Sequence, residues 1–269
     1  MYLEYLVRLI DAPAGVFTPQ NARTVLGMAL QQSGEAFPSV LFGHEEGGGN
    51  VQTLYSLPGD HLHYAAPPMV AVSGGSNFLR LTAVGPQGCD ALREHVARVA
   101  QAVGKFTGHL YSIATYSGKV EIEPSRPTLY QCSALILQKN TKHLIALMKN
   151  FPKDDAGRWN VDFGALIPTI EKSLVRGMIG QALHLDHQMP DGESLFGRMP
   201  SDERLAIKVL EGTTYFYRTE KHRGLALAIR NLVFTMDVKL SGPWSAGQLR
   251  SRGFGAIRQL AASRPRGDE

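Results

Sequence analysis

The sequence predicts an α+β fold in two successive halves, residues 1–124 and 125–269. In the first half, segments with strand and helix patterns follow one another in the order strand, helix, strands, helix, strand. The second half begins again with a strand-first unit. Charge divides at the same place, because residues 1–124 carry seven Lys/Arg against ten Asp/Glu, whereas residues 125–269 carry 21 against 14.

The elements of the first half follow from periodicity and from turn residues. Residues 2–10 are rich in β-formers and predict a strand. Thr18-Pro19 predicts a helix start, and apolar residues recur at helical spacing down to Gly34. The other predicted elements are strands at 37–42, 51–57, 69–72 and 78–84, an amphipathic helix from Cys89 through Val103, and a hairpin of 110–115 with 119–123. This order is that of a ferredoxin-like sandwich.

The second half is predicted to repeat this unit around a helical insertion at about 152–208. A strand is expected at 128–137, a short helix from Thr141 to Met148, and a longer helix from Pro168 through Leu183. Further strands are expected at 205–209, 213–217, 225–229 and 232–240, the last two paired or continuous, with a short return strand at 257–260. The predicted fold class is therefore tandem ferredoxin-like domains with a C-terminal glycine-rich loop at 240–257.

Composition argues against several classes of protein. No apolar run approaches ~20 residues, so no membrane span is expected. The N-terminus lacks the basic-then-apolar layout of a secretion signal. The two cysteines, Cys89 and Cys132, form neither a disulfide framework nor a zinc-ligand spacing. A cytoplasmic protein without a metal or other cofactor is expected.

The stretch Leu240–Ile257 carries the strongest functional signal. It holds four glycines, which let the backbone turn sharply and approach a ligand closely. Arginine suits phosphate oxygens and guanine edges, and aromatic rings stack on bases. The residues expected to contact RNA here are Trp244, Gln248, Arg250, Arg252, Gly253, Phe254 and Gly255. The alternative is a glycine-rich turn that joins two strands.

Positive charge around this stretch favours a polyanionic partner. Residues 212–266 hold ten basic residues, opposed by Glu220 and Asp237. Lys172 and Arg176 are four residues apart on the expected long helix, so they project together and suit the backbone of an RNA stem. The other basic residues expected to bind RNA are Arg218, Lys221, Arg223 and Arg230. The alternatives are a solvated basic surface without a partner, and an ion pair of Arg176 with Glu171 or Asp186.

Two segments resemble motifs of the CRISPR repeat-RNA processing endoribonucleases, within the superfamily of ferredoxin-fold RNA-binding proteins. Ser241–Gly255 resembles the family's C-terminal glycine-rich loop, and Leu174–Leu183 resembles its internal Arg-Gly-x-x-Gly-x-Ala-Leu segment. Length, charge and a divergent first half resemble the type IV branch. The resemblance implies metal-independent cleavage of a repeat-RNA hairpin, in which a ribose 2′-OH attacks the adjacent phosphate. It also implies that the enzyme keeps the mature crRNA and joins other CRISPR effector subunits.

The implied cleavage needs a proton carrier and positive charge beside the developing phosphorane. Family members often place a catalytic histidine at or just after the first helix, but residues 19–34 contain none. His44, in the Gly43–Asn50 loop, is the nearest candidate for general acid or base. Arg23 on the first helix is the candidate to stabilise the phosphorane or to orient the 2′-OH. If His44 is only an exposed loop histidine, arginine charge carries the cut alone.

Two other functions compete with this one. A non-catalytic crRNA-binding subunit of the same superfamily is favoured by the missing histidine of the first helix. An unrelated small-molecule enzyme is disfavoured, because no Walker loop, G-x-G-x-x-G turn or nucleophile elbow is present. His61 with His63, and the group His184, Asp186 and His187, are possible metal ligands. No cysteine joins them to complete a four-ligand zinc site, so surface or helix-capping roles are expected.

Overall fold

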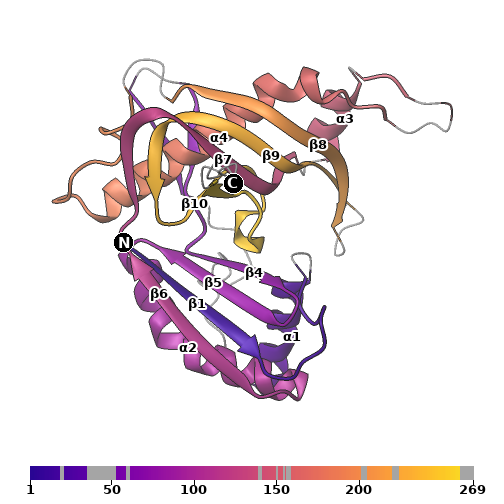
Figure 1. Cartoon of the computed structure of the whole chain (residues 1–269), viewed down its shortest axis with the longest axis vertical. Coiled ribbons are helices and arrows are strands. Elements are labelled where there is room, and N and C mark those ends of the chain that lie inside the picture. The colour runs from indigo at the N-terminus through magenta and orange to yellow at the C-terminus, as the bar shows by residue number, and fades with distance from the viewer. Residues whose placement is uncertain are drawn as a thin grey trace, which may run out of the picture.

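The computed structural model describes residues 1–18, 21–34, 53–58, 61–138, 141–149, 151–153, 155, 159–200, 205–219 and 224–260. These residues form a four-stranded sheet, a five-stranded sheet and a two-stranded ribbon, in a mixed α+β architecture. The two larger sheets lie at opposite ends of the molecule, and the yellow segment that follows β9 reaches the space between them (Figure 1).

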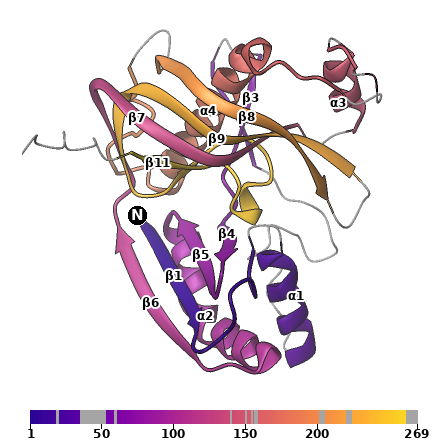
Figure 2. The ribbon, with the colours of Figure 1, turned by 45° about the vertical axis from the view of Figure 1, so that its right-hand side comes forward.

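The four-stranded sheet is formed by the first half of the chain. Its strands are β1 (Tyr2–Leu9), β4 (Val70–Gly75), β5 (Phe78–Val84) and β6 (Tyr111–Gly118), in the antiparallel order β4-β5-β1-β6. Helices α1 (Ala22–Ser33) and α2 (Pro86–Thr107) follow β1 and β5 and lie together on one face of the sheet (Figure 2). When the two short strands between α1 and β4 are left aside, the element order is β1-α1-β4-β5-α2-β6, which is the order expected of this half from the sequence.

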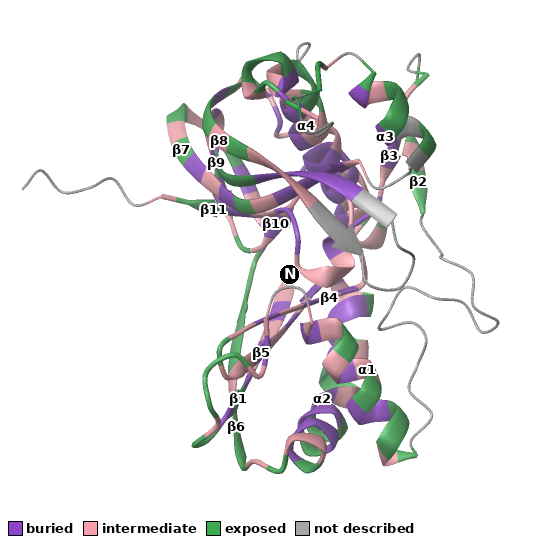
Figure 3. Cartoon of the chain, turned by 90° about the vertical axis from the view of Figure 1, so that its right-hand side faces the viewer, coloured by how far each residue is buried: buried purple, intermediate pink, exposed green. Residues whose placement is uncertain are grey.

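Alternation along the strands decides which face of this sheet is covered. The buried residues of β1 are Leu3, Tyr5, Val7 and Leu9, and they pack with the apolar sides of α1 and α2 in a smaller core. The intervening residues of β1 point to the opposite face. The edge strand β6 is exposed along nearly its whole length (Figure 3). The first half therefore has one closed face and one partly open face.

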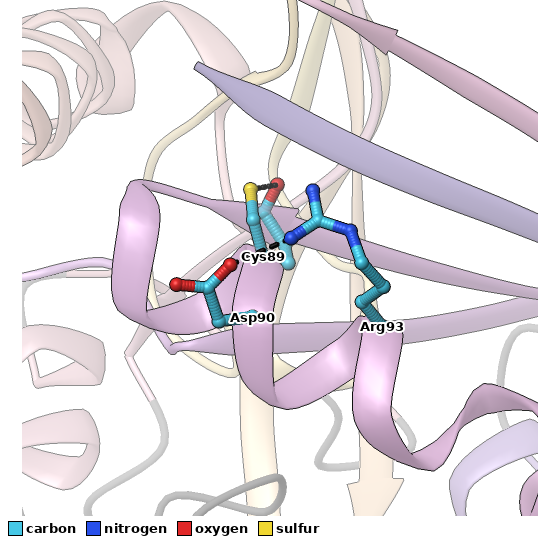
Figure 4. A network of polar contacts seen from close by, with 4 residues as sticks. Cys89, Asp90 and Arg93 are labelled. Atoms are coloured by element: carbon cyan, nitrogen blue, oxygen red, sulfur yellow. Dashed lines mark hydrogen bonds and ion pairs between the residues drawn. The ribbon is translucent and has the colours of Figure 1, made fainter.

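Side-chain contacts in the first turns of both helices fix how the helices begin and which side faces the core. The Asn21 N–H donates to Thr18 Oγ1 at 3.1 Å, and the Thr18 N–H donates to Asn21 Oδ1 at 2.7 Å, which closes the turn before α1. In α2, the buried Cys89 directs its Sγ toward the Ala83 carbonyl oxygen, whereas Asp90 and Arg93 form an ion pair on the exposed side (Figure 4). Inward and outward residues thus alternate as the predicted amphipathic pattern requires.

The five-stranded sheet is formed by the second half of the chain. Its strands are β7 (Glu121–Gln138), β8 (Ile207–Thr219), β9 (Gly224–Ser241), β10 (Trp244–Ser245) and β11 (Ala256–Gln259), in the order β10-β11-β7-β9-β8. The predicted strands at 225–229 and 232–240 are one continuous strand, β9. The predicted hairpin of 110–115 with 119–123 is wrong. β6 pairs instead with the central strand β1, and residues 121–124 continue β7 along β9.

Two helices accompany this sheet, α3 (Thr141–Met148) and α4 (Phe163–Gln188). The helix α4 begins five residues before the predicted start at Pro168, because the Asp162 side chain accepts hydrogen bonds from the Gly164 and Ala165 N–H groups. The apolar side of α4 packs in the larger core with the buried residues of β7, β8 and β9. The ribbon of β2 (Leu54–Ser56) and β3 (His63–Ala65) also lies against α4. Within the described ranges, no helix is long and apolar enough to cross a membrane.

Candidate functional site

The glycine-rich loop between β9 and β11 folds back onto the five-stranded sheet. The Gln248 N–H donates to the Ile136 carbonyl at 2.8 Å, and the Gly255 N–H donates to the Ala134 carbonyl at 2.7 Å. Gly255 has φ +77°, and a Cβ there would collide with the Ala246 carbonyl oxygen. Only glycine therefore fits at this position, where the two arms of the loop pair with each other.

The tip of this loop contacts the other half of the molecule. It forms the short 3₁₀ turn η2 (Arg250–Arg252), which packs against β4. Gly253 follows with φ +75°, and a side chain there would strike Ser73 of β4. The loop thus joins the two sheets at the level of η2 (Figures 1 and 2).

Two arginines converge at this junction, one from each half. The Arg23 Nη1, on the first turn of α1, donates a hydrogen bond to Ser251 Oγ. Burial, and then the positive charge of Arg252, lower the pKa of Arg23 to about 10. Arg23 therefore remains a cation at neutral pH, but its charge is held in an unfavourable environment. We call Arg23, Ser251 and Arg252 the junction cluster, and an anion bound there would relieve its electrostatic repulsion.

Arg250 occupies a different environment, although it is only two residues from Arg252. Its side chain is 6% exposed, and Nη2 donates to the carbonyl oxygens of Ala65 at 2.9 Å and Ala66 at 2.6 Å. Burial lowers the pKa of Arg250 to about 10. The expectation that Arg250 grips RNA is therefore corrected, because its guanidinium anchors the loop to the backbone beside β3.

The aromatic rings of the loop also turn inward. Trp244 is 1% exposed, and its Nε1 donates to the Ser241 carbonyl at 3.1 Å. Phe254 is 3% exposed and packs with Ile136 and Ala228 on the sheet. Neither ring offers a face to a base, which corrects the expected stacking. The apolar environment under the loop outweighs any preference of these rings for the surface.

The other loop residues and the basic residues of the second half divide by exposure. Gln248 is half-buried and donates from Nε2 to Gln138 Oε1 at 2.9 Å. Gly253 is half-buried against Ser73. Arg230 is exposed, with its guanidinium 4.0 Å from the centre of the Tyr215 ring. Arg252 is half-buried beside Arg23 and Ser251.

On α4, Lys172 is exposed and Arg176 is half-buried. The two carboxylates that offered Arg176 an alternative partner have other roles. Glu171 Oε1 accepts from the Val209 N–H at 3.2 Å, and Asp186 accepts from the Ser194 hydroxyl and the Leu195 and Phe196 N–H groups. Neither forms an ion pair with Arg176 among the contacts of the described chain, and the buried Arg176 Nε has no hydrogen-bond partner there.

Four expected site residues are not placed in full. His44, Lys221 and Arg223 lie outside the described residues, and Arg218 lies on β8 with its side chain outside the description. Two of the candidate metal-ligating histidines contact other side chains. His184, half-buried on α4, contacts the Tyr55 hydroxyl through Nδ1 at 2.8 Å, and burial lowers its pKa. His63 contacts Ser56 Oγ at 3.0 Å.

Metal-ligating side chains do not gather in the part of the chain that is described. No group of three or more His, Cys, Asp or Glu residues there is arranged to hold a metal ion. The polar residue of the junction cluster that sequence reasoning missed is Ser251. Its one available signal was its position between Arg250 and Arg252 in the glycine-rich loop.

Comparison with known proteins identifies what the chain is similar to. The model of the family described as type IV CRISPR-associated endonuclease Csf5 matches residues 5–262. No curated protein matches the sequence. Among solved structures, one titled "Csf5, CRISPR-Cas type IV Cas6 crRNA endonuclease" is 15% identical with a TM-score of 0.62, covering 97% of this chain and 99% of its own. A Cas6b structure is 11% identical with a TM-score of 0.59, covering 97% and 100% of the two chains.

Proposed function

This chain belongs to the type IV CRISPR-associated endonuclease Csf5 family, and from that premise we propose that it is the endoribonuclease that matures crRNA. It binds the hairpin of CRISPR repeat RNA and cleaves without a metal ion, by attack of a ribose 2′-OH on the adjacent phosphate. It then stays with the crRNA among other effector subunits in the cytoplasm. The similar structure titled as a crRNA endonuclease supports this proposal.

The observation that carries the proposal is that Arg23 donates a hydrogen bond to Ser251 and lies close enough to Arg252 for that charge to lower its pKa. The attack of a 2′-OH on a phosphate builds negative charge on the phosphorane oxygens. Fixed guanidinium groups stabilise that charge best where the site is partly dry, because they need no reorganisation during the reaction. The depressed pKa of Arg23 reports such a partly dry site. A scissile phosphate bound in the junction cluster receives two charges and donors from two different elements.

In this proposal the fold serves to bring those elements together. The strand orders β4-β5-β1-β6 and β8-β9-β7-β11 match each other position by position, which supports tandem ferredoxin-like units. In the second unit the glycine-rich loop takes the place of a second helix, so that η2 reaches β4 of the first unit. Arg230 on the sheet, with Lys172 and Arg176 on α4, supplies further charge for the RNA backbone. Such contacts read the shape of a stem more than its sequence.

The proposal is tested by cleavage of a hairpin-forming CRISPR repeat RNA in EDTA. A matched substrate carries a 2′-deoxyribose at the position upstream of the cut. We expect the first RNA to be cut, leaving a 2′,3′-cyclic phosphate and a 5′-OH, and the second to be bound but left intact. Cutting of the deoxy substrate, or cutting only after a divalent ion is added, would contradict the proposed mechanism.

The proton carrier is tested separately by the dependence of the cleavage rate on pH. Arg23 keeps its charge far above neutrality and therefore contributes no inflection near pH 7. If His44 is the general acid or base, the single-turnover rate shows an inflection within about pH 5–8, where histidine titrates, and His44→Ala abolishes it. A wild-type profile without that inflection would remove His44 from the mechanism and leave arginine charge to carry the cut.

A second function is kept because residues 19–34 contain no histidine. On this view the chain is a non-catalytic crRNA-binding subunit of the CRISPR ribonucleoprotein, and the junction cluster holds a phosphate without cutting. Tight binding of both test RNAs without any cleavage would favour this subunit over the enzyme.

A further inference from the structure

The face of the four-stranded sheet that α1 and α2 leave uncovered has a distinct chemical character. Strand alternation and pairing register direct six informative side chains toward it, which we call the open face: Glu4, Leu6, Arg8, Phe78, Arg80 and Tyr116. Arg8 and Tyr116 are exposed, and the other four are half-buried. Two arginines against one carboxylate make this set net positive.

An aromatic ring and two guanidinium groups are neighbours on the open face. Arg8 lies directly opposite Phe78 in the pairing of β1 with β5. The Phe78 ring leans over Gly75 of β4, where an added Cβ would lie 3.1 Å from the ring, and the Arg80 guanidinium lies 5.8 Å from the ring centre. Glu4 is turned toward Arg80 at 3.5 Å, so its charge is partly neutralised. A partly exposed ring flanked by arginines suits a base that stacks and a phosphate that pairs.

The open face is continuous with the junction cluster. Ser73 lies opposite Arg80 in the pairing of β4 with β5, and Gly253, the residue after η2, lies against Ser73. A strand of RNA that leaves the junction cluster at Arg252 would therefore cross β4 at Ser73. Beyond Ser73 it would meet first Arg80 and then Phe78. Neighbouring strands are about 5 Å apart, so these steps span only a few nucleotides.

We propose that the open face binds the single-stranded RNA that adjoins the repeat hairpin, with one base stacked on Phe78 and its backbone held by Arg8 and Arg80. This inference rests on the proposed function, because it takes the scissile phosphate to lie in the junction cluster. A single strand is favoured over a duplex, since only unpaired bases turn a face toward an aromatic side chain.

The test compares two RNAs, a repeat hairpin alone and the same hairpin extended on either side by a short oligouridine. We expect the extended RNA to bind wild-type protein about tenfold more tightly on one side of the hairpin, as one stacked base allows. Phe78→Leu should lose this gain while binding the hairpin alone as before, and Phe78→Trp should keep it. Arg8→Ser should lower the salt dependence of binding for the extended RNA only.

Controls separate this inference from the proposed function. Arg98→Ser removes an exposed arginine from α2, on the opposite side of the sheet, and should keep the gain. If wild-type protein cuts the hairpin but gains nothing from either extension, or if Phe78→Leu keeps the gain, the open-face site is overturned and the nuclease stands. Failure of wild-type protein to bind either RNA would overturn both.

Discussion

Arg23→Ala is expected to lower the single-turnover rate of repeat-RNA cleavage by about 10²–10³-fold, the range found when one donor is removed from a preorganised anion site. The substitution removes a charge and the hydrogen bond to Ser251. Because the charge on the phosphate oxygens grows in the transition state, the rate should fall much more than the affinity for uncut RNA. A gel-based cleavage assay with enzyme in excess, beside a binding titration, measures both quantities.

The stability of the Arg23→Ala protein distinguishes a functional residue from a structural one. The pKa of Arg23 in the folded protein, about 10, lies below its ordinary value, so the charged form opposes folding. The free energy of unfolding therefore rises as the pH increases from about 10 toward the ordinary pKa of arginine. At neutral pH the burial of the charged guanidinium destabilises the folded state. Because the substitution removes both this buried charge and the hydrogen bond to Ser251, which act in opposite directions, we expect urea unfolding of Arg23→Ala without RNA to show only a small change in stability.

Matched variants sharpen this prediction. Arg98→Ala removes an exposed arginine from α2 and should leave cleavage unchanged. Arg252→Ala should resemble Arg23→Ala, and Arg23→Lys should recover only part of the rate, because an ammonium lacks the guanidinium fork. If Arg23→Ala cuts at the wild-type rate, the junction cluster is not the cleavage site.

The elements that could be predicted from sequence are those in which the spacing of apolar residues alone determines which side is buried. β1 alternates between core and open face, and α2 keeps one apolar side, so both were expected at nearly their observed positions. β7 was not expected as one strand, because Pro124 and Pro127 interrupt its pattern. The structure places a register shift between Pro124 and Thr128 and continues the strand on both sides.

The candidate site was harder to predict, because sequence does not show which way a loop turns its side chains. Arg250 and Arg252 looked equivalent, and Trp244 and Phe254 looked available for stacking. In the folded loop Arg250, Trp244 and Phe254 are buried, whereas Arg252 is half-buried and close enough to Arg23 for its charge to lower the pKa of Arg23. Contacts with distant parts of the chain, which no local sequence pattern shows, determine which of these side chains are buried.

The two segments that resemble motifs of the family, Leu174–Leu183 and Ser241–Gly255, both contact the Ala65 carbonyl group. A Cβ at Gly180 of α4 would collide with the Ala65 carbonyl oxygen, which accepts a hydrogen bond from Arg250 of the loop at 2.9 Å. Gly180 thus lets β3 approach α4 closely enough to hold Arg250. We expect Gly180→Ala to destabilise the protein by about 2–3 kcal/mol, since a fixed backbone cannot yield as a side chain does.

Arg250→Ala is expected to destabilise the protein by a similar amount, because the Ala65 and Ala66 carbonyl groups both lose their donor. Urea unfolding of the double variant tests the link between the two sites. If both substitutions act through the Ala65 carbonyl, their effects on the free energy of unfolding add to less than the sum of the single effects. Gly27→Ala in α1 is the matched control. Apart from its chain neighbours and the backbone of its own helix, no atom lies within 4 Å of its added Cβ, so it should stabilise the helix by about 0.5–1 kcal/mol. Full additivity would mean that α4 and the glycine-rich loop are held independently, and Arg250 would then need another explanation for its burial.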